Sequence, residues 1–224
     1  MNGLRLTPLL GLILVLGACA TQFNMPPVTQ VANGEHLPGK IIWHDLLTDT
    51  PERTEVFYSE LFGWKFEALP DKKINYTLIR HEGELIGGMV DQNRLPNKMD
   101  ISQWVVGLSV VNIEKTAKAL LEAGGTVYTP PTSLGERGQI AVVADSQGAL
   151  LALLETRDGD PLDGEGTTAP GGFLWDELWA DDVAGAAEFY HRLSPYTIDE
   201  ETLGSEESPV DYRVLIDNDH PRAG

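Results

Sequence analysis

Cysteine is almost absent from this sequence. Cys19 is the only cysteine among 224 residues, so no disulfide can form within the chain and stability depends on a packed core. Basic side chains are also scarce, with 16 Lys and Arg against 34 Asp and Glu and a formal net charge of −18. That balance argues against nucleic acid or an anionic lipid surface as a direct partner, and acidic surfaces mostly confer solubility.

Long hydrophobic runs are absent too, and the one continuous apolar run is short. It covers residues 9–16, whereas a helix that spans a bilayer needs about 20 apolar residues. Arg5 precedes the run, and the small residues Gly17 and Ala18 follow it. A charged start, a short apolar stretch and a small-residue end predict a secretory signal peptide over residues 1–18.

The end of this segment resembles the bacterial lipobox, in which a cysteine becomes the new N-terminus and carries acyl chains. The sequence LGAC at residues 16–19 carries the resemblance. It implies lipidation of Cys19, a lipidated tether over residues 19–39 and attachment to a membrane of the cell envelope. Ala20, in place of aspartate, implies the periplasmic face of the outer membrane if the organism is Gram-negative. The alternative is an ordinary signal peptide followed by a chance cysteine.

Residues 40–157 contain the pattern β-α-β-β-β twice, and this repetition decides the expected fold. In the first unit, Pro51 marks the start of a helix and Gly63 its end. In the second unit, Gly124-Gly125 ends the helix. The expected strands are 41–48, 64–69, 75–80 and 84–90, then 104–110, 126–128, 139–144 and 149–155. The predicted fold class is α+β.

A third copy of the pattern begins after a linker predicted at residues 158–172. Residues 41–58 align with residues 173–190 at a constant offset of 132. The matched pairs are Trp43 with Trp175, Leu46 with Leu178, Phe57-Tyr58 with Phe189-Tyr190 and, in charge, Asp45 with Glu177. The sequence stops where the fourth strand of this copy should start. We therefore expect residues 173–224 to be a fragment of a longer protein, or to be covered by a second copy of the chain or another partner.

The paired units resemble the vicinal oxygen chelate superfamily, which includes glyoxalase I, extradiol dioxygenases and bleomycin-resistance proteins. The resemblance covers about residues 40–217 and is closest to a group of predicted enzymes related to lactoylglutathione lyase. It is carried by Trp43, Asp45, Leu46, Phe57-Tyr58, Gly63-Trp64, Gly124-Gly125, Pro130-Pro131 and Asp145-Ser146-Gln147-Gly148-Ala149. It implies that two units curl into one half-barrel of eight strands, with an incomplete third unit beside it. It specifies fold more than function, because the superfamily contains both enzymes and pure binders.

Metal-dependent members of this superfamily place one His or Glu at each of four inward-facing strand positions. By alignment, those positions fall on Trp43, on or beside Gly88, on Val105 and on Ala152. None of these side chains binds a metal, which needs several N or O ligands converging on one point. The expectation is therefore no metal and no cofactor.

The same positions are expected to line a pocket instead, together with Asp45 and, in the third copy, Trp175 and Glu177. The two tryptophans are either core packing or the floor of an aromatic pocket. In the second case, Asp45 or Glu177 is the polar group that receives a flat or cationic organic molecule. A buried carboxylate with a raised pKa could also act as a base, although no second catalytic partner is visible.

Three hypotheses for function follow. The favoured one is a membrane-tethered, glyoxalase-like protein that binds a small organic molecule in a metal-free pocket. The second is an enzyme of the same fold, a lyase, isomerase or dioxygenase, with a non-standard site. The third is a non-catalytic envelope scaffold whose pocket is filled by side chains. No nucleic-acid partner is expected under any of them.

Overall fold

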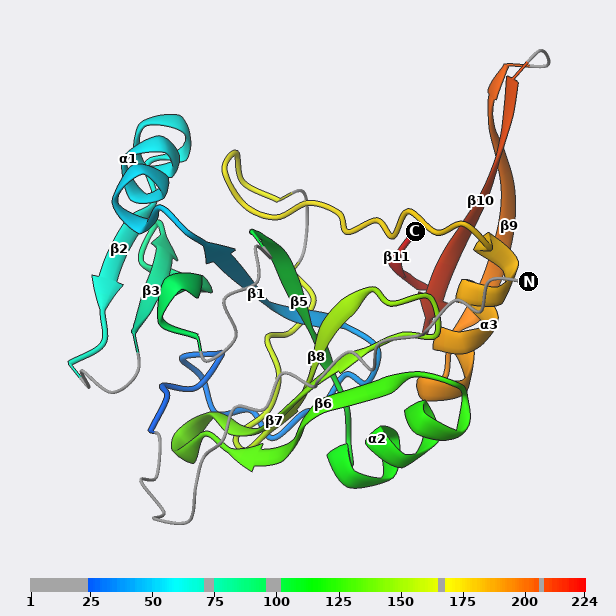
Figure 1. Ribbon diagram of the computed structural model, residues 1–224, viewed down its shortest axis with the longest axis horizontal. Helices are drawn as coiled ribbons and strands as arrows, with labels where there is room; N and C mark the ends of the chain where they lie inside the picture. Colours follow the sequence, from blue (N-terminus) through cyan, green and yellow to red (C-terminus); the bar gives the residue numbers. More distant parts are fainter. Residues whose placement is uncertain (1–23, 71–74, 96–101, 165–167, 206–207) are drawn as a thin grey trace, which may run out of the picture.

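The computed structural model describes residues 24–70, 75–95, 102–164, 168–205 and 208–224, so Cys19 and the predicted signal peptide lie outside the described residues. The fold is α+β, as predicted: one sheet has eight strands in the order β2-β3-β4-β1-β5-β8-β7-β6, and a second has three in the order β11-β10-β9. Figure 1 shows the large sheet curving through the body, with the β9–β10 hairpin projecting from one side.

The first two modules have the expected element order, whereas the third lacks the expected first strand and contains a fourth strand at residues 220–223 that was not expected. The first contains β1 (Ile41–Thr48), α1 (Pro51–Phe62), β2 (Lys65–Ala68), β3 (Tyr76–His81) and β4 (Glu84–Asp91). The second contains β5 (Gln103–Ser109), α2 (Ile113–Glu122), β6 (Thr126–Ser133), the short turn η2 (Gly135–Arg137), β7 (Gly138–Ala144) and β8 (Leu150–Thr156). The third contains α3 (Val183–Leu193), β9 (Thr197–Ser205), β10 (Ser208–Asp217) and β11 (His220–Ala223). A further short turn, η1 (Gln92–Arg94), follows β4.

The two complete modules meet at the middle of the large sheet. β1 pairs in parallel with β4 of its own module and antiparallel with β5 of the next. β5 pairs in parallel with β8, so the strand order of one module is repeated in reverse in the other. The centre of the sheet is therefore built from both modules.

The helices differ in how they are buried. α2 is capped by the Asn112 side chain, which accepts from the backbone N–H of Lys115, and it buries Ile113 and Leu120 in the main core. α3 adds Phe189 to that same core. The matching residue of α1, Phe57, is 56% exposed. The apolar spacing of α1 therefore predicted the helix correctly, but it did not show whether the apolar face of that helix would be buried.

The segments predicted as tether and linker both contain buried residues. Met25 and Val28, within the predicted tether, are each 4% exposed and pack in a core cluster. Asp160, within the predicted linker, is fully buried. Its carboxylate accepts hydrogen bonds from the Leu37 N–H at 2.7 Å and the Ser109 hydroxyl at 2.5 Å. Much of residues 24–39 is thus part of the folded body.

The first strand expected for the third module does not form a ladder. Its backbone forms two hydrogen bonds, from the Leu178 N–H to the Gly224 carbonyl at 2.8 Å and from the Gly224 N–H to the Asp176 carbonyl at 3.1 Å. Phe173, at the start of the segment, stacks on His44 at a centroid distance of 3.7 Å. This segment is therefore positioned by the stacking of Phe173 on His44 as well as by these two backbone hydrogen bonds.

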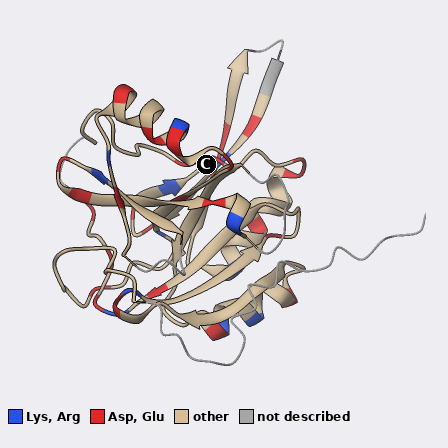
Figure 2. Ribbon diagram, turned by 60° about the vertical axis from the view of Figure 1, so that its left-hand side comes forward, with Lys and Arg blue, Asp and Glu red and all other residues tan. Residues whose placement is uncertain are grey.

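Acidic side chains are distributed over much of the molecule. Figure 2 shows Asp and Glu spread over helices, strands and loops, with fewer Lys and Arg among them. Among the described residues, no helix is both long enough and apolar enough to cross a membrane.

Candidate functional site

The positions predicted from the resemblance come together at the junction of the two modules. They form two adjacent rows across β4, β1, β5 and β8 on the large sheet. The residues paired along the rows are Gly88–Asp45–Val105 and Trp43–Gly107–Ala152. The counting that located these positions in the sequence is therefore consistent with the strand register.

A hydrogen-bonded cluster fills this face of the sheet. The Tyr76 hydroxyl donates to Asp45 Oδ1 at 2.5 Å, and Trp43 Nε1 lies 3.0 Å from the same oxygen and 2.9 Å from the Tyr76 hydroxyl. Arg137, from η2, places its guanidinium carbon 4.0 Å from the centroid of the Trp43 ring. Its Nε donates to the Pro26 carbonyl at 2.9 Å, and its Nη1 donates to the Tyr76 hydroxyl at 3.4 Å. Two modules and the N-terminal segment all contribute to this cluster.

The N-terminal segment closes the cluster. The Met25 N–H donates to the Leu134 carbonyl at 2.9 Å, and the Met25 side chain packs in the same core cluster as Trp43 and Tyr76. Tyr76 approaches Gly88 so closely that a Cβ atom there would lie 1.9 Å from the Tyr76 oxygen. The inward face of the half-barrel is therefore packed with the chain's own side chains.

Enclosure raises the pKa of two groups in the cluster. Burial raises the pKa of Asp45, and the hydrogen bond from Tyr76 and the charge of Arg137 only partly oppose this. Burial and the neighbouring Asp45 charge also raise the pKa of Tyr76, so its phenol stays protonated and remains a donor. The arrangement holds the Asp45 side chain in place through the indole of Trp43 and the phenol of Tyr76.

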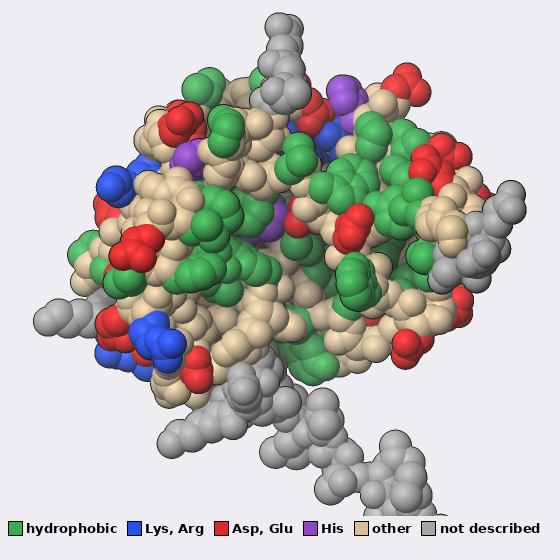
Figure 3. All heavy atoms as spheres, turned by 90° about the horizontal axis from the view of Figure 1, so that it is seen from above, with side chains coloured by type: hydrophobic (Ala, Val, Ile, Leu, Met, Phe, Trp, Pro, Cys, Tyr) green, Lys and Arg blue, Asp and Glu red, His purple; other side chains and the backbone are tan. Residues whose placement is uncertain are grey.

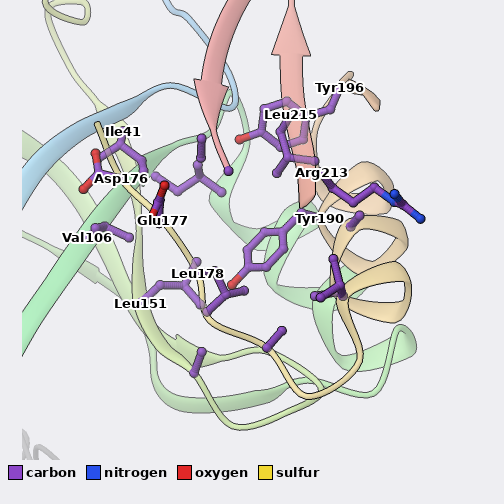
Figure 4. Close-up of a pocket in the computed structure, with 18 of the residues that line it drawn as sticks. Ile41, Val106, Leu151, Asp176, Glu177, Leu178, Tyr190, Tyr196, Arg213 and Leu215 are labelled. Carbon is purple, nitrogen blue, oxygen red and sulfur yellow. The ribbon is translucent and has the colours of Figure 1, made fainter. Parts of the chain in front are cut away.

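A cavity of about 390 Å³ lies on the other face of the large sheet, against the third module. Val106 on β5 alternates with Val105 and so faces this side. The opposite wall comes from α3, β10 and the segment that contains Leu178. In Figure 4 the ring of Tyr190 reaches from α3 toward Leu178 and Leu151, so the interior of the cavity is mainly apolar.

Charged groups stand at the edge of the cavity. Asp176 lies 2.9 Å from His44 Nε2, and this contact joins the first module to the third. Glu177 and Arg213 also line the cavity wall. His44 lies on the opposite face from Trp43, as strand alternation predicts.

The predicted pocket-lining set needs a correction. Of its seven residues only Glu177 lines the cavity; Trp43, Asp45, Gly88, Val105, Ala152 and Trp175 do not. Trp43, Val105 and Ala152 are at most 6% exposed, and Trp43 packs with Met25 and Tyr76 beneath the guanidinium of Arg137. The reading of Trp43 as core packing therefore describes this structure, whereas Trp175 is 38% exposed and donates to Tyr212, which lines the edge of the cavity.

The residues at the superfamily's metal positions do not fit a metal. An indole, a glycine, a valine and an alanine offer no lone pair for a divalent cation. Glu155, the nearest carboxylate along β8, caps α2 by accepting from the Ile113 N–H at 2.7 Å. Across the part of the chain that the structure describes, no group of three or more His, Cys, Asp or Glu side chains could hold a metal ion.

Sequence reasoning missed Tyr76, Arg137 and Met25. Tyr76 had one usable signal, because the partial third copy carries Tyr212 on its corresponding strand β10. Arg137 had none, since a single arginine in a Gly-containing turn is normally an exposed residue. Met25 lies in a segment without periodicity, and its contacts with η2 connect residues more than 100 positions apart.

No family model matches the chain. It is 29% identical over 170 residues to the anthracycline biosynthesis protein DauV of Streptomyces sp. (strain C5), covering 68% of this chain and 59% of DauV. It is also 29% identical over 120 residues to CFP32 of Mycobacterium tuberculosis, a protein named as a proposed glyoxylase, covering 52% of this chain and 44% of CFP32. The chain thus spans about half the length of these curated relatives.

Solved structures share the architecture at low sequence identity. A catechol 2,3-dioxygenase matches with a TM-score of 0.51 and 13% identity, covering 80% of this chain and 66% of that one. A mutant 4-hydroxymandelate synthase from Streptomyces coelicolor matches with a TM-score of 0.53 and 14% identity, covering 81% and 60%. Together with the paired modules, these matches show that the chain has the fold of the vicinal oxygen chelate superfamily.

Proposed function

We propose that this protein is a membrane-tethered binding protein that takes a small organic molecule without the help of a metal. The observation that carries the proposal is the location of the cavity, which lies on the face of the large sheet opposite the superfamily's metal positions. The face where the superfamily's metal ligands stand is packed by Trp43, Tyr76 and Arg137, whereas the opposite face carries the cavity. A ligand that binds there meets mainly apolar walls, with a few charged side chains among the lining residues.

The cavity has the size and lining that suit such a ligand. Its volume of about 390 Å³ lies in the range of small-molecule sites, roughly 300–1,000 Å³. Apolar side chains bind the body of a ligand, while Asp176, Glu177 and Arg213 at the wall give polar groups that fix its orientation. Two curated relatives are named for the biosynthesis of anthracyclines, which are small organic molecules, and this supports a ligand of that general class.

Filling the cavity tests this assignment. A Val106→Trp variant places an indole into the cavity from β5, and we expect it to abolish the ligand-induced rise in Tm seen with hits from a panel of small organic molecules. The control is Val111→Trp, at a position that is 62% exposed and does not line the cavity. A ligand that binds only the folded state stabilises it by an amount that grows with the logarithm of ligand concentration above Kd, so the rise in Tm reports binding. A panel without a single hit on the unmodified protein would favour the scaffold hypothesis, and retained shifts in Val106→Trp would place the ligand elsewhere.

The tether is tested separately at Cys19. Replacing Cys19 with Ser removes the lipid-bearing thiol, and we expect the protein to move from the membrane to the soluble fraction after cell fractionation. A single acyl chain binds a membrane only marginally, so a lipoprotein anchor needs several chains on this one residue. Membrane association that persists in the Ser variant would exclude the proposed anchor. An intact mass of the purified protein that corresponds to an unmodified Cys19 would exclude the anchor as well.

A further inference from the structure

The third module repeats the buried cluster of the first. Trp175 Nε1 donates to the Tyr212 hydroxyl at 2.9 Å, and that hydroxyl donates to Glu177 Oε1 at 3.0 Å. This reproduces the contacts among an indole, a phenol and a carboxylate found in the first module. Two tryptophans, two acids and two tyrosines, far apart in the sequence, thus form the same local arrangement.

A glycine completes both copies. A Cβ at Gly224 would lie 1.9 Å from the Tyr212 oxygen, the same separation found between Gly88 and Tyr76. Gly224 bridges to the Asp176–Leu178 segment, which places it beside Glu177 as Gly88 is beside Asp45. The equivalent residues are Trp43 and Trp175, Asp45 and Glu177, Tyr76 and Tyr212, and Gly88 and Gly224.

The two copies differ in what covers them. In the first, the guanidinium of Arg137 stacks on Trp43 and donates to Tyr76. In the third, Trp175 is 38% exposed and Glu177 is exposed. Two nearby arginines have other partners, since Arg213 pairs with Asp211 and Arg222 with Asp163.

We propose that the Trp175–Glu177–Tyr212 cluster is an arginine-binding site for a polypeptide partner, which presents the arginine on an apolar hairpin. The chemistry of the occupant is taken from the first module, where the indole and the phenol contact the guanidinium of Arg137 and the charge of Arg137 acts on the pKa of Asp45. The charge agrees, because the site offers a carboxylate on a chain with a net charge of −18. An arginine fits this site better than a lysine, since a planar guanidinium both stacks on an indole and donates several hydrogen bonds.

The surroundings of the cluster favour a polypeptide over a free guanidinium compound. An exposed ion pair and an exposed cation–π contact are each weak, so a bare cation would bind poorly. Val210, 52% exposed, lies two residues before Tyr212 on β10 and pairs with Leu203, 43% exposed, on β9. With Trp179 at 92% exposure, these side chains provide apolar area beside the carboxylate. Figure 3 shows hydrophobic side chains gathered with acidic ones on the face of the molecule that is seen from above.

Arg137 also shows what kind of segment carries such an arginine. It lies in a turn between β6 and β7, flanked by Leu134 and Ile140, which pack against the first cluster. A partner with an arginine in a tight turn and an aliphatic residue on each side would provide both the guanidinium contact and the apolar packing seen in the first module. The chain's own turn therefore provides a probe.

The experiment uses a cyclised peptide of residues 131–141 and the purified full chain, with binding followed by calorimetry. We expect the arginine peptide to bind and a peptide with citrulline at position 137, which is neutral but of the same shape, to bind at least tenfold more weakly. Glu177→Gln should weaken binding of the arginine peptide at least tenfold. Glu122→Gln on α2, where the carboxylate pairs only with exposed Lys118, is the charge-matched control and should leave it unchanged.

Several results would overturn the proposal. Equal binding of the two peptides would mean an apolar surface without arginine recognition. Unchanged binding in Glu177→Gln, or no binding of the arginine peptide, would exclude the cluster as its site. A homodimer in sedimentation equilibrium that Glu177→Gln dissolves would assign the face to a second copy of the chain and not to a separate partner.

Discussion

Asp160→Ala is expected to lower the free energy of unfolding by about 3–5 kcal/mol. The Asp160 carboxylate accepts from the Leu37 N–H, the Ser109 hydroxyl and, at 2.7 Å, the Thr156 hydroxyl, all in a fully buried position. Alanine leaves these donors buried without an acceptor, and each such group costs about 1–3 kcal/mol. Urea denaturation followed by tryptophan fluorescence measures the change.

The same chain offers a control two residues away. Asp158 pairs with Arg157 at the surface, and exposed pairs contribute at most about 1 kcal/mol, so Asp158→Ala should have little effect. Asp160→Asn keeps one acceptor oxygen and should fall between the two. A loss below about 1 kcal/mol in Asp160→Ala would contradict the role given to this carboxylate in fixing residues 33–37 to the body.

Arg137→Ala should have a loss of similar size, about 3–5 kcal/mol, for a different reason. Removing one partner of a buried charged cluster leaves the other charge uncompensated, which is strongly destabilising. Asp45 would lose the nearby cation that opposes the rise of its pKa, and Trp43 would lose the group stacked on its ring. The loss of the Arg137 bond to the Pro26 carbonyl should also loosen the N-terminal segment.

Two measurements separate these effects. Urea denaturation gives the total loss of stability, and hydrogen exchange at Met25 reports whether the bond to the Leu134 carbonyl opens more often. Arg157→Ala, at a side chain that is 56% exposed, is the control and should change stability by less than about 0.5 kcal/mol. An Arg137 variant as stable as this control would show that the cluster is held by packing alone.

Local signals in the sequence were enough to predict the modules. Pro51 and Gly63 bound α1 as expected, and Gly63 adopts the left-handed conformation, with φ of 71°, that ends a helix. The positions located by alignment to the superfamily, Gly88 and Val105, both pair with Asp45 in the structure. These features depend on short-range chemistry and on strand periodicity, which a sequence displays directly.

The location of the cavity could not be predicted in the same way. Which face of a sheet stays open depends on the segments that pack against it from elsewhere in the chain. Arg137 and Met25 pack on one face through contacts over long sequence separations, and α3 packs on the other face beside the cavity. The contrast between Phe57 and Phe189 has the same origin, because equal helical patterns were covered in one module and left exposed in the other.

The packing of the N-terminal segment also sets the height and orientation of the molecule above a membrane. With a lipid on Cys19, as proposed, only residues 19–23 separate it from Asn24, whose side chain already accepts from the Glu136 N–H. Five residues span at most about 18 Å, roughly two screening lengths at physiological salt. Figure 1 places the first described residues and the β9–β10 hairpin at opposite ends of the body. An anchor this short would hold the η2 end near the lipid and turn the hairpin outward, where a partner in solution can reach it.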